Sequence, residues 1–321
     1  MSKRRITHQQ AARIKKNQND RILSPPIDTS ANTAEGLVIA RLGRRLILEN
    51  AEGQKLSAAL RPHLHAIVAG DRVLYQQDQE KQNNTVVVSL FPRQSVLMRA
   101  DSKPIAANIT QIIIVVSPRP MLSWILLDSY LIMADYLNLT PLIVFNKIDL
   151  DESNLYDQLE KNYGPLGYAI VKTGLNYSAG DIALSQALNH QTSIFVGQSG
   201  VGKSSLITRI LPDEKDIQTG EISSKTHLGC HTTSNTRLYH LPNGGALIDS
   251  PGIREFSLSQ LKVTDIAKGY REFKPLISLC KYRNCNHHNT PGCAIINSVK
   301  LKLISALRYE NYVKLSTQHP I

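Results

Sequence analysis

One stretch decides the fold of this chain: Gly197-Gln198-Ser199-Gly200-Val201-Gly202-Lys203-Ser204-Ser205. It follows the apolar run 194–196, which predicts a short buried strand, and it leads into a helical pattern that Pro212 ends. Glycines between a strand and a helix let backbone N–H groups turn toward phosphate oxygens at the positive end of the helix. A glycine-rich turn that matches by chance is the alternative, but the strand and helix around it favour a phosphate loop.

The second informative stretch is Asn146-Lys147-Ile148-Asp149, which follows the apolar run 142–145. Such a run is typical of a central parallel strand. Asp149 can accept the N1–H and the exocyclic amine of guanine, and adenine offers no matching donors. Alone, the tetrapeptide could be a solvated turn. Together with a phosphate loop, it predicts that the bound nucleotide is GTP.

Magnesium ligands are expected both within and after the phosphate loop. Lys203 should reach the β- and γ-phosphates, and the Ser204 hydroxyl should bind Mg²⁺. Asp249 follows a further strand candidate and should hold Mg²⁺ through water, while the N–H of Gly252 senses the γ-phosphate. A second hydroxyl should come from Thr232 or Thr233, and the sequence does not decide which.

The order of these motifs is unusual. In an ordinary small GTPase the phosphate loop opens the domain and the base-reading motif lies near its end. Here the base-reading motif precedes the phosphate loop by about fifty residues. This order predicts a circularly permuted GTPase.

The residue that activates water is harder to identify. GTPases of the Ras type carry a water-orienting Gln after the Asp-x-x-Gly motif, and this chain has Ile253 there. His231 is the best catalytic candidate, because a neutral imidazole can accept a proton from water near pH 7. The alternatives are a solvated loop residue or a contact to a partner. The fifth GTPase motif is degenerate as well, because the segment 171–175 has no clear Ser-Ala pair.

A separate constellation near the C-terminus consists of Cys280, Cys285, His287 and Cys293. Three thiolates and one imidazole suit a closed tetrahedral site for one structural Zn²⁺ ion. A disulfide framework would leave one of the three cysteines unpaired. His288 is an alternative to His287, and Cys230 is expected to be an ordinary thiol.

Charge suggests a polyanionic partner. The formal net charge is +11, and residues 1–25 alone contribute +6. This arm is expected to be disordered in isolation, and it is interpreted either as a solubilising tail or as an arm that binds RNA phosphates. The zinc region carries further basic residues: Lys281, Arg283, His287, His288, Lys300, Lys302 and Arg308. No apolar run approaches the length of a membrane span, so no membrane partner is expected.

The pattern of predicted elements indicates a multidomain protein. Short strands at 36–41, 45–49, 71–75 and 85–89 favour an OB-type β-barrel, with an SH3-like barrel as the alternative. From residue 108 strands and helices alternate, which predicts a mostly parallel α/β sheet. The expected division is a basic arm (1–33), an OB barrel (34–98), a circularly permuted P-loop GTPase (99–260) and a mainly helical zinc-binding domain (261–321).

Taken together, the chain resembles the ribosome small-subunit-dependent GTPase A family of bacterial ribosome biogenesis factors. The resemblance rests on Val68-Ala-Gly-Asp-Arg-Val73, the base-reading and phosphate motifs, His231-Thr-Thr233, Asp249-Ser-Pro-Gly-Ile-Arg-Glu-Phe256 and the Cys/His set. It implies a cytoplasmic, monomeric GTPase that acts late in 30S subunit maturation, binds 16S rRNA, and couples its GTP or GDP state to subunit binding and release. It also implies a catalytic role at the His231 position and hydrolysis stimulated by the subunit.

Two departures from the family pattern stand out: Asp128-Ser-Tyr replaces the usual Asp-Arg-Tyr, and the fifth motif is eroded. Neither touches the groups expected to bind Mg²⁺ or phosphate. Two other functions stay open. The chain could be an RNA-binding assembly factor that uses GTP as a passive switch, or a permuted GTPase that serves another ribosomal or non-ribosomal partner.

Overall fold

The computed structural model describes residues 33–43, 45–61, 64, 66–77, 85–99, 103–212, 236–250, 258 and 261–317. These residues form two compact units. The first contains 33–97, 104–108 and 236–238, and the second contains 98–103, 109–212 and the described residues from 239 onward. None of the described helices combines the length and apolar character needed to cross a bilayer.

The first unit is a closed five-stranded barrel. Its strands are β1 (Thr33–Leu42), β2 (Arg45–Glu49), β3 (Lys55–Leu60), β4 (Arg72–Gln77) and β5 (Thr85–Leu90). They pair in the order β1-β2-β3-β5-β4, and β4 closes back onto β1. All pairs are antiparallel except β3 with β5. This arrangement confirms the OB-type barrel. Strands β6 (Val96–Met98) and β7 (Pro104–Ala107) form a separate two-stranded sheet.

Strand β3 has no counterpart among the strands that the sequence predicts. Its residues, Lys-Leu-Ser-Ala-Ala-Leu, include no β-branched or aromatic side chain, so their intrinsic strand preference is weak. Pairing with β2 and β5 overrides that preference, and Ala58 becomes fully buried in the barrel core.

A buried ion pair explains the Val68–Val73 motif of the barrel. Asp71 is completely buried, and its carboxylate accepts two hydrogen bonds of 2.7 Å from Arg93. The same carboxylate accepts a bond of 2.8 Å from the Val68 backbone N–H. Arg93 also donates to the carbonyl of Ala66. Asp71 therefore fixes the turn that leads into β4.

The second unit is built on a parallel sheet with the strand order β10-β9-β8-β11-β13. Its strands are β8 (Gln111–Val116), β9 (Thr140–Phe145), β10 (Ala169–Lys172), β11 (Thr192–Val196) and β13 (Ala246–Asp249), and β12 (Arg237–His240) precedes β13. The central strand β8 is buried along its whole length. As the sequence predicts, these continuous apolar runs are covered on both faces.

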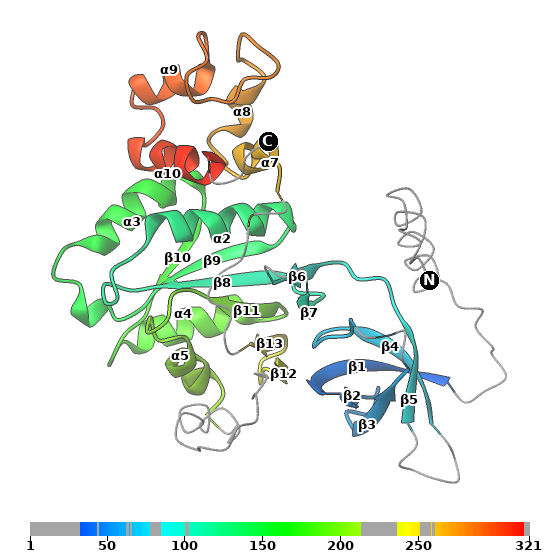
Figure 1. Cartoon of the computed structure of the whole chain (residues 1–321). Helices are drawn as coiled ribbons and strands as arrows, with labels where there is room; N and C mark the ends of the chain where they lie inside the picture. The colour runs from blue at the N-terminus through cyan, green and yellow to red at the C-terminus, as the bar shows by residue number, and fades with distance from the viewer. Residues whose placement is uncertain are drawn as a thin grey trace, which may run out of the picture. The chain divides into compact units, whose positions relative to one another are not determined.

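Helices cover both faces of this sheet (Figure 1). One side carries α2 (Trp124–Tyr136) and α3 (Leu155–Tyr163), and the other carries α4 (Ser178–Leu188) and α5 (Lys203–Ile210). Short 3-10 turns lie at Ile148–Leu150 and Gly164–Leu166. The side chains of α4 and α5 pack on the sheet in one core that includes Val115, Val144, Leu184, Leu206 and Leu247.

The C-terminal region is mainly helical, as expected. Its helices are α7 (Val263–Lys268), α8 (Lys274–Ile277), α9 (Ala294–Lys300) and α10 (Ala306–Thr317). Helices α7 and α10 both contact α2, so this region belongs to the same compact unit as the parallel sheet.

A buried charge network holds α10 on α2. The carboxylate of Asp128, which is fully buried, forms an ion pair with Arg308 and accepts hydrogen bonds of 2.8 Å from both Tyr163 and Asn311. Arg308 is only 1% exposed and also pairs with Glu272. Although burial alone would lower the pKa of Arg308, Asp128 and Glu272 raise it well above its ordinary value. The expectation that Arg308 belongs to a basic RNA-binding surface is therefore wrong, because its charge is buried and paired.

We expect Arg308→Ala to lower the free energy of unfolding by about 3–5 kcal/mol, because it leaves the Asp128 carboxylate buried without its cation. The matched control is Lys274→Ala, which breaks a partly exposed ion pair between α8 and Asp135 of α2 and should cost less than about 1 kcal/mol. Urea unfolding of both variants measures the difference. Equal losses would contradict the central role of Arg308.

Candidate nucleotide site and metal centre

Four loops of the candidate site leave the same edge of the parallel sheet. The base-reading motif follows β9, the segment from Thr173 follows β10, the phosphate loop follows β11, and Asp249 ends β13. Because the strands are parallel, their carboxyl ends lie together. The fold thus brings together motifs that the permuted sequence separates.

The side chain of Asn146 joins three of these loops. Its amide nitrogen donates to the carbonyl of Val201 in the phosphate loop at 2.9 Å. Its amide oxygen accepts a bond from the Thr173 hydroxyl at 2.9 Å. Asn146 is 6% exposed, and both partner residues are fully buried. Asn146 therefore connects the base-reading motif to the phosphate loop rather than pointing to solvent.

Lys147 makes a second connection to the phosphate loop. Its ammonium donates to the carbonyls of Gly200 at 2.6 Å and Arg119 at 2.8 Å. Gly202 of the phosphate loop packs against Asn146: a Cβ built on Gly202 would lie 2.3 Å from the amide nitrogen of Asn146. Its φ of +97° is in the left-handed region. Glycine is required at this position for both reasons.

The phosphate loop has an inward-turned lysine. Lys203 begins α5, and its ammonium donates to the carbonyls of Gly197 and Gln198, both at 2.7 Å. Ser204 and Ser205 lie exposed in the first turn of the same helix. Backbone N–H groups at such a helix start, together with a nearby ammonium, form a ready site for an anion.

Asp249 lies at the end of β13, close enough to Lys203 to interact with it electrostatically. Burial raises the pKa of Asp249 above its ordinary value, while the Ser250 backbone and Lys203 act in the opposite direction. A divalent cation beside this carboxylate would favour its ionised form in the same way that Lys203 does.

The segment 173–175, in which the sequence shows no clear fifth motif, contacts the base-reading motif. The Leu175 backbone N–H donates to the Asp149 carboxylate at 3.0 Å, and the Ile148 N–H donates to the Thr173 carbonyl at 3.1 Å. A Cβ on Gly174 would lie 2.7 Å from the same carboxylate. Sequence reasoning left this segment unassigned, since no side-chain motif marks it. Its place directly after a parallel strand is the one signal that could have found it.

Several predicted site residues lie outside the described part of the chain. They are His231, Thr232, Thr233 and Gly252, together with Ile253 and Cys230. The expected catalytic and switch functions of these residues stay predictions.

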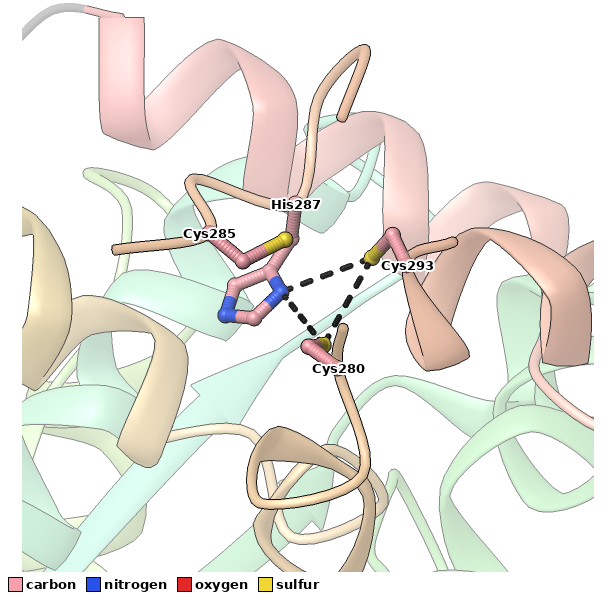
Figure 2. A group of neighbouring side chains, drawn as sticks. All are labelled: Cys280, Cys285, His287 and Cys293. Atoms are coloured by element: carbon pink, nitrogen blue, oxygen red, sulfur yellow. Dashed lines mark hydrogen bonds between the residues drawn. The ribbon is translucent and has the colours of Figure 1, made fainter. Parts of the chain in front are cut away.

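The predicted metal ligands come together in the C-terminal region. Among the described residues, Cys280, Cys285, His287 and Cys293 have ligand atoms that all lie within 4.8 Å of one another. Figure 2 shows the four side chains pointing toward one another. His288 turns away from this cluster, and its Nε2 lies 2.7 Å from the Ser316 hydroxyl. This placement favours His287 over His288 as the fourth ligand.

The distances in this cluster fit a tetrahedral ion. The Nδ1 atom of His287 lies 3.5 Å from the Sγ atoms of both Cys280 and Cys293, and these two sulfurs are 3.9 Å apart. Tetrahedral Zn²⁺ with ordinary bond lengths implies roughly 3.6 Å between nitrogen and sulfur and roughly 3.8 Å between sulfurs. Burial and the neighbouring His288 lower the pKa of His287, which favours the neutral ring that a metal requires.

Helix α10 holds the backbone of the metal cluster. The Tyr309 hydroxyl donates to the carbonyls of His287 at 2.9 Å and His288 at 3.1 Å. The Tyr312 hydroxyl donates to the carbonyl of Asn286 at 2.9 Å. The helix that pairs with Asp128 through Arg308 therefore also supports the metal-binding loop.

Comparison with known proteins gives consistent results. The family model described as RsgA GTPase matches residues 90–259. "Small ribosomal subunit biogenesis GTPase RsgA 1" of Vibrio parahaemolyticus is 39% identical, over 98% of this chain and 93% of the relative. "Small ribosomal subunit biogenesis GTPase RsgA" of Haemophilus influenzae is 41% identical, over 98% of this chain and 95% of the relative.

Two solved structures share the fold. The crystal structure of YjeQ from Thermotoga maritima has a TM-score of 0.73 and 29% identity, and the match covers 89% of this chain and 98% of that one. The structure of YloQ, described as a circularly permuted GTPase, has a TM-score of 0.70 at 23% identity, with 92% and 97% covered. The permuted order predicted from the sequence is thus confirmed.

We expect Asn146→Ala to lower the free energy of unfolding by about 2–3 kcal/mol, because the buried Val201 carbonyl and Thr173 hydroxyl lose their shared partner. The control is Asn297→Ala, which changes an exposed asparagine on α9 and should leave stability within about 0.5 kcal/mol of the parent. Thermal unfolding measures both. An Asn146→Ala variant as stable as the control would show that this junction is unimportant.

Proposed function

Because this chain belongs to the RsgA GTPase family, we propose that it hydrolyses GTP and uses the nucleotide state to bind and leave the maturing small ribosomal subunit. One observation carries the proposal: Asn146 and Lys147 of the base-reading motif bond directly to the phosphate loop. A guanine and its phosphates can then be held by one continuous set of loops. The names of the relatives, which are 39–42% identical over 98% of the chain, supply the ribosomal partner.

The proposed roles within the site follow the chemistry of each group. Asp149 pairs with guanine, and the backbone of 197–202 with Lys203 holds the phosphates. Ser204 and either Thr232 or Thr233 would bind Mg²⁺ directly and Asp249 would hold it through water, and the ion would neutralise charge on the phosphates. The Gly252 N–H senses the γ-phosphate. His231 remains our proposed water-activating residue.

We propose that the Cys/His cluster binds one structural Zn²⁺ ion. All four positions of a tetrahedral ion would be filled by protein atoms, so the metal has no open position for a reactant. Its contribution is to fold the loop between α8 and α9, where few apolar side chains are buried. The chemistry of GTP hydrolysis stays in the sheet-edge site.

The proposed RNA contacts are electrostatic. The basic arm 1–33 would neutralise 16S rRNA phosphates, assisted by exposed residues of the zinc region such as Lys281, Arg283, Lys300 and Lys302. We also propose a monomer in which the barrel spans 34–98, the GTPase 99–260 and the zinc-binding domain 261–321. Binding through phosphates should weaken steeply with salt.

The decisive experiment measures GTP hydrolysis with and without purified small ribosomal subunits. We expect the subunit to stimulate the parent protein, and Lys203→Ala to lose at least about 100-fold of that activity because the phosphates lose their cation. Large subunits serve as the partner control. Hydrolysis that small subunits do not stimulate would favour a passive nucleotide switch, and stimulation by large subunits alone would reassign the partner.

Metal content gives an independent prediction. Purified protein should contain about one zinc per chain, and Cys293→Ser should lose it, because a buried hydroxyl is a much poorer zinc ligand than a thiolate. Cys230→Ser is the matched control and should retain the metal, as should Lys203→Ala. Elemental analysis decides the point: zinc retained in Cys293→Ser, or absent from the parent, would rule out the proposed site.

A further inference from the structure

Arg209 connects two parts of the nucleotide site that are distant in sequence. It lies in the last turn of α5, the helix that starts at the phosphate loop. The Nη1 atom of its guanidinium donates to the carbonyl of Gly174 at 2.9 Å. The Nη2 atom pairs with the Asp181 carboxylate of α4 at 3.1 Å. A planar guanidinium presents these two N–H donors in a rigid fork with fixed directions, whereas an ammonium is a compact charge on a flexible stem.

The bond to Gly174 acts on a particular peptide unit. The carbonyl of Gly174 and the N–H of Leu175 are the two ends of one planar peptide, and in a trans peptide they point in opposite directions. Arg209 binds the carbonyl end. The N–H end donates to the Asp149 carboxylate. Fixing one end of this peptide therefore fixes the direction of the other.

Among the residues that the structure describes, few other contacts restrain this peptide. Gly174 has no side chain, and glycine adopts alternative backbone conformations at low cost. Leu175 is 75% exposed, so its side chain adds no packing restraint. The preceding residue, Thr173, is anchored through its hydroxyl to Asn146. Rotation of the 174–175 peptide is thus opposed mainly by the bonds at its two ends.

We propose that Arg209 is a positioning residue for guanine recognition: it holds the 174–175 peptide so that the Leu175 N–H and the Asp149 carboxylate keep one fixed arrangement against the base. This inference rests on the proposed function, in which Asp149 pairs with guanine. Asp181 has a supporting role, since it orients the guanidinium. The Arg209 and Asp181 side chains are 33% and 41% exposed, so this ion pair by itself contributes little.

The positioning role predicts a loss of affinity that is specific to guanine nucleotides, which general stabilisation does not predict. Arg209 bonds to the Gly174 carbonyl, and the N–H of the same peptide bonds to Asp149, the proposed guanine-pairing residue, whereas Lys203 bonds within the proposed phosphate loop. Loss of Arg209 should weaken binding of a guanine nucleotide while leaving the phosphate contacts intact. A merely structural residue would weaken all nucleotides alike.

The test compares GDP and ADP binding by the full chain with Mg²⁺, by displacement of a fluorescent GDP analogue. For Arg209→Ala we expect GDP affinity to fall about tenfold, the size of one charge-assisted hydrogen bond. ADP affinity should not change, so the GDP-to-ADP preference falls by the same factor. Arg209→Lys should lie between parent and alanine variant, because the ammonium keeps the charge but lacks the rigid fork that fixes the directions of both bonds.

Two further variants sharpen the test. Asp181→Ala should lower the preference about twofold in the parent and have no additional effect in the Arg209→Ala background, because it acts through Arg209. Thr208→Ala is the control on the same helix, since among the described residues its hydroxyl donates to the Ser204 carbonyl of the same helix, and it should behave like the parent.

The outcomes are distinguishable. An unchanged preference in Arg209→Ala, or equal losses for GDP and ADP, would overturn the positioning role while leaving the proposed function standing. A parent protein that does not prefer GDP over ADP would instead reject the proposed function itself.

Discussion

The candidate site depends on the two hydrogen bonds of the Asn146 side chain. Asn146 directly follows strand β9, at a point where three loops meet, and its side chain is buried there. Its amide donates to the phosphate loop and accepts from the loop after β10. A buried amide that lost either partner would leave polar atoms unsatisfied. This requirement couples the positions of the base-reading and phosphate-binding elements.

The parallel sheet explains why the permuted order does not disturb the site. In a parallel sheet every strand sends its following loop to the same edge, whatever the order of the strands along the chain. Strands β9 and β10 precede β11 and β13 in sequence, yet their loops lie together because β8 and β11 pair in the middle of the sheet. Geometry at the strand ends, rather than the order of motifs, defines this nucleotide site.

Helix α10 connects the C-terminal region to the parallel-sheet part of the same unit. Arg308 on this helix pairs with Asp128 of α2. The N-cap residue of α2 is Ser123, whose N–H donates to the side-chain oxygen of Gln198 in the phosphate loop at 3.3 Å. On its other side, α10 holds the metal loop through Tyr309 and Tyr312. The Cys/His cluster and the nucleotide loops are thus linked through the packed helices α2 and α10.

The sequence by itself determined the GTPase family, the permuted order and the four Cys/His side chains that lie together, because each depends on residue types at short spacing: the phosphate loop, Asn146–Asp149 and the Cys/His set. It did not predict strand β3, the burial and pairing of Arg308, or the contact of the 173–175 segment with Asp149. Those were decided by tertiary structure: β3 by pairing with its neighbours, Arg308 by a carboxylate 180 residues away, and 173–175 by its contact with Asp149. Local patterns carry no information about such contacts, since their energy exists only once distant segments have packed together.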